Sequence, residues 1–209
     1  MMLGRHDIAE SLTSAVEKSY PAMRAQLEGY AAEHSPQEKS YAGLFTVLRS
    51  PGLRPYINAG SAREATITKI DSYRDNWWCK DLDLGPQSDK YDGDNHWWDR
   101  ESDLEIMRAR SAPPDLAFLS PERVEAARSE WQKLKQLGAG PSYLARQTLQ
   151  WAKDRPDDPR VPEALHFAVR STRYSCDDEQ TSALSHKAFE LLHSRYASSK
   201  WAKQTPYWF

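Results

Sequence analysis

The sequence predicts an all-α protein of helical hairpins, interrupted by a long irregular region that is rich in tryptophan. Capped segments with apolar residues at the helical period of about 3.6 occupy both ends of the 209-residue chain. A repeat of about 41 residues closes the chain. Residues 51–117 lack a sustained helical period. We therefore expect three parts of one compact unit, at residues 1–50, 51–117 and 118–209.

Three short helices are expected in the first fifty residues. Asp7, followed three residues later by Glu10, matches a capping box for the first helix, which Tyr-Pro at residues 20–21 ends. An apolar stripe then predicts the second helix. The sequence SPQE at residues 35–38 supplies a cap, a proline in the first turn and an acid for the third helix. Ser-Pro-Gly at residues 50–52 ends it.

The central region is expected to be irregular and packed on the helices. Ser61 and Glu64 can cap a short helix, but the alternation in ATITKI at residues 65–70 equally fits a strand. Residues 71–117 lack a sustained period of either kind. A loop of this length within a compact domain is usually either functional or disordered.

Helical periodicity returns near residue 118 and predicts five further helices. Ser, Thr or Asp residues, which favour helix starts, mark each of them. The expected starts are Ser120, Ser142, Asp158, Thr181 and Ser198 or Ser199. Gly138 is expected to end the first of the five. The aromatic residues 207–209 are expected to pack against the helices, because three exposed rings would be costly.

The repeat aligns LQWAKDRPDDPRVPEALHFAV with LLHSRYASSKWAKQTPYWF. In both segments a helix is followed by a polar cap and a new helix. This region, residues 142–209, resembles the tetratricopeptide class at the junction between repeats. The stretch KAFELLHSRYASSKWA supplies the matching residues Ala188, Leu191, Leu192, Tyr196, Ser199 and Ala202, and has Ala197 where that class has proline.

A second resemblance covers most of the chain. LRSPGLRPYINAG, YRDNWWC, DPRVPEALHFAVRSTRYSC and AFELLHSRYASSKWAKQTPYWF occur in this order. They are similar to the C-terminal region of large uncharacterised bacterial helical-repeat proteins. The resemblance implies that a longer N-terminal part exists and that the DNWW segment belongs to the architecture. It also implies that Cys79 and Cys176 are paired or packed in contact. The residues themselves leave one disulfide, two buried thiols or neither open, and they favour free thiols.

Residues 71–103 contain four of the eight tryptophans, in two adjacent pairs that each follow an Asp-Asn dipeptide. Aromatic faces beside short polar side chains suit sugar recognition. The candidate ligand residues are Trp77, Trp78, Trp97, Trp98, Asp75, Asn76, Asp94 and Asn95. We favour the alternative that one tryptophan of each pair anchors the loop on the helices.

For the other candidate sites, a structural role is favoured over ligand or metal binding. One set of acidic residues has the oxygen ligands that Ca²⁺ prefers. Gly93 comes too early in the sequence for the D-x-D-x-D-G order of a calcium-binding loop, so a solvated acidic loop is favoured. That set is Asp89, Asp92, Asp94, Asn95, Asp99 and Asp103. His166, His186 and His193 lie on expected helices without the spacing of a metal pair. No cofactor is expected. Known catalytic motifs do not occur, so the sequence favours a non-enzymatic protein and leaves enzymatic activity open.

Composition restricts the partners of the chain. Its formal net charge of −2 gives no electrostatic reason to expect nucleic acid. Its mean hydropathy of −0.80 indicates a soluble protein, and no stretch approaches the roughly 20 apolar residues of a membrane span. The first residues lack the apolar part of a signal peptide, which indicates the cytoplasm unless the chain is a fragment of a longer exported protein.

Stacked helical hairpins usually leave a curved surface that binds another protein or a peptide. The leading hypothesis is therefore a non-enzymatic protein–protein interaction or scaffold module, which rests on fold analogy. The alternative is a carbohydrate-binding or carbohydrate-processing protein that uses the tryptophan-rich loop.

Overall fold

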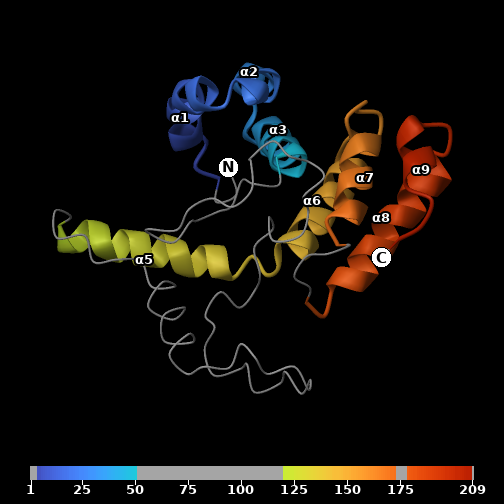
Figure 1. The fold of residues 1–209 in the computed structure, drawn as a ribbon. Coiled ribbons are helices and arrows are strands. Elements are labelled where there is room, and N and C mark those ends of the chain that lie inside the picture. The colour runs from blue at the N-terminus through green and yellow to red at the C-terminus, as the bar shows by residue number, and fades with distance from the viewer. Residues whose placement is uncertain (1–3, 51–119, 173–177, 209) are drawn as a thin grey trace, which may run out of the picture.

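The computed structural model describes residues 4–50, 120–172 and 178–208 (Figure 1). Every regular element within these ranges is a helix, which confirms the predicted all-α class. The expected irregular region at residues 51–117 lies outside the described residues. So do both cysteines, Cys79 and Cys176.

The N-terminal part contains the three expected helices. They are α1 (His6–Ser19), α2 (Arg24–Ala32) and α3 (Pro36–Arg49), with a short 3₁₀ turn, η1 (Pro21–Met23), before α2. The proline that begins η1 ends α1, as the sequence predicts, because the proline nitrogen has no hydrogen to donate to the preceding turn.

One of the two predicted capping boxes forms. The Ser35 hydroxyl accepts from the Glu38 backbone N–H at 3.1 Å, and the Ser35 N–H donates to the Glu38 carboxylate at 3.4 Å. The predicted cap at Asp7 is wrong, because α1 already begins at His6, and Arg5 occupies the capping position without a side-chain hydrogen bond to the first helical turn's backbone. Asp7 lies inside the first turn instead, where a carboxylate still interacts favourably with the positive helix end.

The C-terminal part contains the five expected helices. Their bounds are α5 (Pro121–Lys135), α6 (Gly140–Asp154), α7 (Val161–Arg170), α8 (Thr181–Arg195) and α9 (Lys200–Gln204). The starts at Ser120 and Thr181 agree with the prediction, and Ser199 caps α9 by accepting from the Ala202 N–H at 3.1 Å. Helix α6 begins two residues before the expected Ser142, and α7 begins three residues after Asp158.

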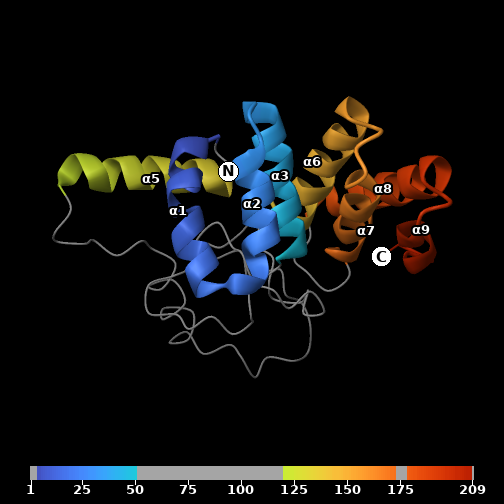
Figure 2. The same ribbon diagram turned by 90° about the horizontal axis from the view of Figure 1, so that it is seen from above.

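Apart from α5, the helices follow one another across the molecule in chain order, whereas α5 runs away from α6–α9 and passes α1 (Figures 1 and 2). Arg5, just before α1, pairs with Glu130 of α5 at 3.2 Å. Helix α6 packs on both α7 and α8, and α7 packs on both α8 and α9. Helices α6 and α8 each have 15 residues, and α8 begins and ends 41 residues after α6. Their buried positions keep this spacing, since Trp151 of α6 and Leu192 of α8 are both 0% exposed.

An aromatic cluster centred on Trp151 joins α3 to α6. The indole of Trp151 stacks on the Tyr41 ring at 5.4 Å between centroids, and the Phe45 ring meets it edge-on at 6.0 Å. Arg49 at the end of α3 forms an ion pair with Glu163 of α7 at 3.2 Å. The main hydrophobic core therefore runs continuously from α3 through α6, α7 and α8 to α9.

Helix α1 lies at the edge of this core. It contains no buried residue, and Ile8 and Leu12 are 43% and 52% exposed. Val16 packs against the small apolar cluster of Met23 and Leu27, and polar contacts add to this packing. His6 Nδ1 and the Tyr30 hydroxyl share a hydrogen bond of 2.8 Å, and Lys39 of α3 forms an ion pair with Glu10.

Two of the three C-terminal aromatic residues are not packed down as predicted, and the third, Phe209, lies outside the described residues. Tyr207 and Trp208 are 56% and 40% exposed. The Trp208 ring meets the His186 ring in an edge-to-face contact, with 4.8 Å between the ring centroids. Helix α9 ends at Gln204, and Thr205 is the last buried residue in the described part of the chain. The two rings therefore lie beyond the end of α9, outside the core cluster.

Candidate functional site

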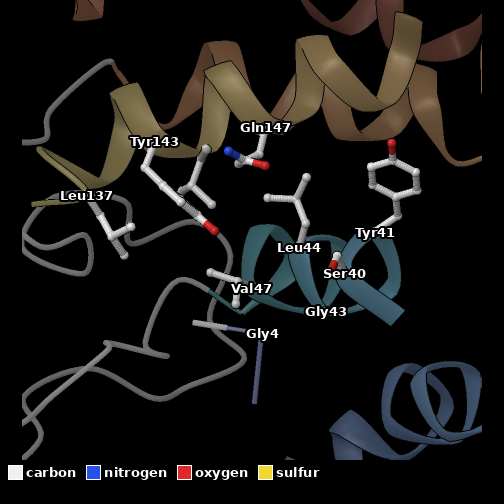
Figure 3. A pocket seen from close by; sticks show the side chains of 10 residues that line it. Gly4, Ser40, Tyr41, Gly43, Leu44, Val47, Leu137, Tyr143 and Gln147 are labelled. Atoms are coloured by element: carbon white, nitrogen blue, oxygen red, sulfur yellow. The ribbon is translucent and has the colours of Figure 1, made fainter. Parts of the chain in front are cut away.

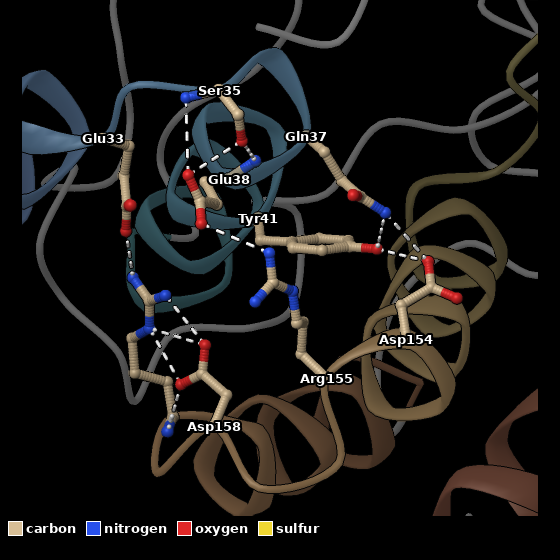
Figure 4. Close-up of polar contacts among 9 residues, drawn as sticks. Glu33, Ser35, Gln37, Glu38, Tyr41, Asp154, Arg155 and Asp158 are labelled. Atoms are coloured by element: carbon tan, nitrogen blue, oxygen red, sulfur yellow. Dashed lines mark hydrogen bonds and ion pairs between the residues drawn. The ribbon is translucent and has the colours of Figure 1, made fainter.

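Two hollows lie in the seam between the N-terminal helices and α6–α7, and both include Tyr41. We call the first the apolar hollow; it has a volume of about 260 Å³ and lies between α3 and α6 (Figure 3). We call the second the acidic hollow; it has a volume of about 440 Å³ and lies where the α2–α3 and α6–α7 connections meet (Figure 4).

The apolar hollow is built from one face of each helix. On α3 the residues Ser40, Leu44 and Val47 follow the helical period, and on α6 Tyr143, Leu144 and Gln147 do the same. Leu44, Val47 and Leu144 are core residues and therefore form firm walls. Gln147 and Ser40 add polar atoms to the lining (Figure 3). Burial raises the pKa of the Tyr143 hydroxyl, so this group stays neutral near pH 7.

Five carboxylates and two guanidinium groups line the acidic hollow, which gives it an excess of negative charge. The acids are Glu33, Glu38, Asp154, Asp157 and Asp158, and the bases are Arg155 and Arg160. The run DRPDDPR at residues 154–160 supplies most of these charges. That run is the sequence signal that points to this hollow, and sequence reasoning passed over it.

Ion pairs tie the two connections together across the acidic hollow. The Arg160 guanidinium lies 3.1 Å from the Glu33 carboxylate and 2.8 Å from the Asp158 carboxylate. Arg155 reaches Glu38 at 3.2 Å (Figure 4). The Arg160 guanidinium also lies over the Trp151 ring, at 5.2 Å from the centroid, which links the polar seam to the aromatic contact beneath it.

Hydrogen bonds keep the carboxylates of the acidic hollow ionised. The Tyr41 hydroxyl, Gln150 and Gln37 donate to Asp154, and the pKa of this carboxyl is lowered. The Ser35 hydroxyl and backbone N–H lower the pKa of Glu38 in the same way. Burial acts to raise the pKa of Asp158, but the hydrogen bonds from Arg160 outweigh it, and the net shift is downward. The hollow is therefore negatively charged at neutral pH.

A Ser–His–Tyr arrangement adjoins the apolar hollow. The Ser40 hydroxyl lies 3.3 Å from His6 Nε2, while His6 Nδ1 is bonded to Tyr30. Nucleophilic catalysis also needs hydrogen-bond donors for an oxyanion beside the nucleophile. Ser40 lies within α3, where backbone N–H groups donate to carbonyls four residues back, and its hydroxyl donates to the Pro36 carbonyl at 2.8 Å. The arrangement therefore connects α1, α2 and α3 and does not provide a catalytic centre.

The three histidines singled out in the sequence have packing roles. His166 is buried, and its Nδ1 shares a hydrogen bond of 2.7 Å with the Thr205 hydroxyl. His193 Nε2 bonds the Thr205 carbonyl at 2.7 Å, and His186 lies 3.8 Å from the Glu190 carboxylate. Burial lowers the pKa of His166 to about 4, so its ring is neutral at pH 7.

The candidate ligand residues of the tryptophan-rich stretch lie outside the described residues, as do the acidic residues considered for calcium. Among the residues that the structure describes, no group of three or more His, Cys, Asp or Glu side chains is placed to hold a metal ion. No helix within the described ranges combines the length and apolar character needed to cross a membrane.

Comparison of the chain with protein-family models, with curated proteins and with solved structures gave no match.

Proposed function

We propose that this chain is a non-enzymatic protein–protein interaction or scaffold module made of tetratricopeptide-like helical hairpins. The acidic hollow carries the proposal, because it is a charged depression of about 440 Å³ where two helix connections meet. Proteins of stacked helical hairpins typically bind partners on the surfaces that the stacking creates.

The packing of the last four helices supports the hairpin type. Each helix packs on the next in the chain, and α6 and α7 also reach one helix further, to α8 and α9. Small buried residues at these contacts let the helices approach closely. They are Ala145, Ala164, Ala168, Ala188 and Ala202. The equal length and 41-residue separation of α6 and α8 fit a repeating unit of two helices.

The charge of the acidic hollow favours a partner segment with lysine or arginine side chains. Asp157 has a 98% exposed side chain and meets Arg195 at 3.7 Å, so it remains accessible to a second cation. Exposed ion pairs such as Arg155–Glu38 contribute only about 0–1 kcal/mol, so an incoming guanidinium can exchange with Arg155 at small cost. We expect a complex that weakens as the salt concentration rises.

A peptide-display selection on the full chain tests the proposal. Enriched peptides are expected to carry lysine or arginine, and the best of them is then titrated as a labelled synthetic peptide by fluorescence anisotropy. Asp157→Lys should weaken its binding by roughly fivefold to tenfold, because attraction is replaced by repulsion. Glu179→Lys is the matched control, since Glu179 is exposed at the start of α8 and away from the hollow, and it should leave binding unchanged.

Selected peptides without basic residues, or equal affinity for the two lysine variants, would contradict the proposed role of the acidic hollow. A glycan array with the same full chain covers the carbohydrate alternative. Glycan binding that is lost in Trp77→Ala and retained in Asp157→Lys would replace the interaction-module proposal.

A further inference from the structure

The outer face of α1 carries an apolar stripe at one end of the series of helices (Figures 1 and 2). Ile8, Leu12 and Ala15 are spaced by four and three residues, so their side chains lie on one face of the helix. All three residues are exposed. The end elements of a helical stack need a polar outer face to stay soluble alone, so an apolar stripe at this position indicates a further partner.

Two residues of opposite charge border the apolar stripe on the same side. Asp7 in the first turn and Lys18 in the last turn are eleven residues apart. Eleven residues make three helical turns, so the two side chains point in nearly the same direction, about 16 Å apart along the axis. The hydrogen bond from Arg5 lowers the pKa of Asp7, so its carboxylate is ionised at neutral pH. The border of the stripe therefore has a negative end and a positive end.

This charge pattern makes α1 complementary to an antiparallel copy of itself. A twofold axis beside Leu12 places Asp7 of each copy next to Lys18 of the other, at both ends of the contact. At the centre, Leu12 meets its symmetry mate, and Ile8 lies opposite the small Ala15. A parallel pair would instead place acid against acid and base against base. Charge therefore favours the antiparallel arrangement.

The existing ion pairs of α1 leave both charged groups accessible. Arg5 is shared between Asp7 at 3.4 Å and Glu130 of α5 at 3.2 Å. The Asp7 side chain is 71% exposed, so it can accept a second cation. Lys18 is exposed and has no ion-pair partner among the described residues. Antiparallel pairing therefore adds two ion pairs without breaking an existing one.

We propose that the outer face of α1 is a homodimer interface, in which α1 of a second copy of this chain packs antiparallel across a twofold axis beside Leu12. One face of a helix about 21 Å long covers less than the roughly 800 Å² per partner of a standard interface, so the dimer forms reversibly at high protein concentration. The interface is separate from the proposed partner site, because α1 contributes none of the described residues that line the acidic hollow.

Sedimentation velocity of the full chain at concentrations from roughly 10 µM to 1 mM tests the proposal. The parent chain should change from monomer to dimer across this range. Leu12→Glu places two acids at the twofold axis and should weaken dimerisation by roughly tenfold or more. Leu12 is 52% exposed, so this substitution leaves the fold intact. Glu179→Lys, in the exposed turn before α8, is the control and should leave the association unchanged.

Charge exchange tests the antiparallel arrangement. Asp7→Lys and Lys18→Asp should each weaken dimerisation by roughly tenfold, because like charges then face one another at both ends. The double variant should recover the parent affinity, as should an equimolar mixture of the two single variants, since every facing pair is again of opposite charge. Fraying of α1 would persist in the double variant, which carries both substitutions, so recovery identifies the ion pairs as the cause.

A parent chain that stays monomeric at every concentration would overturn the proposal and leave the stripe to a different partner. Association that Leu12→Glu leaves unchanged would also overturn it, because the contact would then lie elsewhere on the chain. Absence of recovery in both the double variant and the mixture would overturn the antiparallel pairing. Asp157→Lys should dimerise like the parent, so the loss of peptide binding in that variant reports on the acidic hollow alone.

Discussion

Replacement of Trp151 by alanine should destabilise the protein more than any substitution at its surface. The indole is 0% exposed, and it contacts the Tyr41 and Phe45 rings and the Arg160 guanidinium. Loss of a buried Trp side chain costs about 3–5 kcal/mol, and the aromatic pairs place this site at the upper end, near 4–5 kcal/mol. The total stability of such a domain is roughly 5–15 kcal/mol. The substitution should therefore lower the melting temperature by about 10–15 °C.

Urea unfolding followed by far-UV circular dichroism measures this loss. Trp208→Ala is the matched control, because it removes the same side chain from a position that is 40% exposed. It should cost less than about 1 kcal/mol. Equal losses for the two variants would refute the conclusion that Trp151 joins α3 to the C-terminal helices. A changed denaturant slope for Trp151→Ala would show that the two groups of helices unfold separately.

Three further predictions concern single residues. Ser35→Ala should remove the capping box of α3 and lower the unfolding free energy by about 1 kcal/mol in urea titrations. Gly138→Ala should destabilise by about 1–2 kcal/mol, because φ is +81° and the new Cβ would lie 3.2 Å from Asp178 Oδ2. The pKa of buried His166 is lowered from 6.5 to about 4, so its contribution to stability should be complete above pH 6.5 and decline by about 3 kcal/mol as the pH falls to 4.

Each of these predictions has a matched control. Ser194→Ala removes a hydroxyl from the exposed surface of α8 and should change stability by less than about 0.5 kcal/mol. Gly29→Ala lies within α2 with nothing within 4 Å of the new Cβ, so it should stabilise by about 0.5–1 kcal/mol. His166→Gln should flatten the stability profile between pH 4 and 6.5 if the ring causes the decline. If the stability of His166→Gln still declines between pH 6.5 and 4 as in the parent, the decline is caused by other titrating groups.

The sequence alone determined the helix boundaries wherever a boundary depends on contacts within one turn. Ser35 and Glu38 are three residues apart, so their capping box is visible in the sequence, and Ser199 caps α9 through a contact of the same range. Asp7 shows the limit of this method. Its spacing to Glu10 satisfies the same pattern, but α1 begins one residue earlier, at His6.

Tertiary structure alone decided which helix faces meet and where hollows remain. The apolar stripe of α3 indicates that Tyr41 faces a core, but it does not identify Trp151 as the neighbour. Arg160 and Glu33 meet across 127 residues of sequence, and no local pattern specifies that pairing. Periodicity gives the buried face of each helix, whereas the partner of that face depends on the packing of all the helices together. The acidic hollow and the apolar hollow exist because of that packing, and the sequence therefore showed their residues without showing the sites.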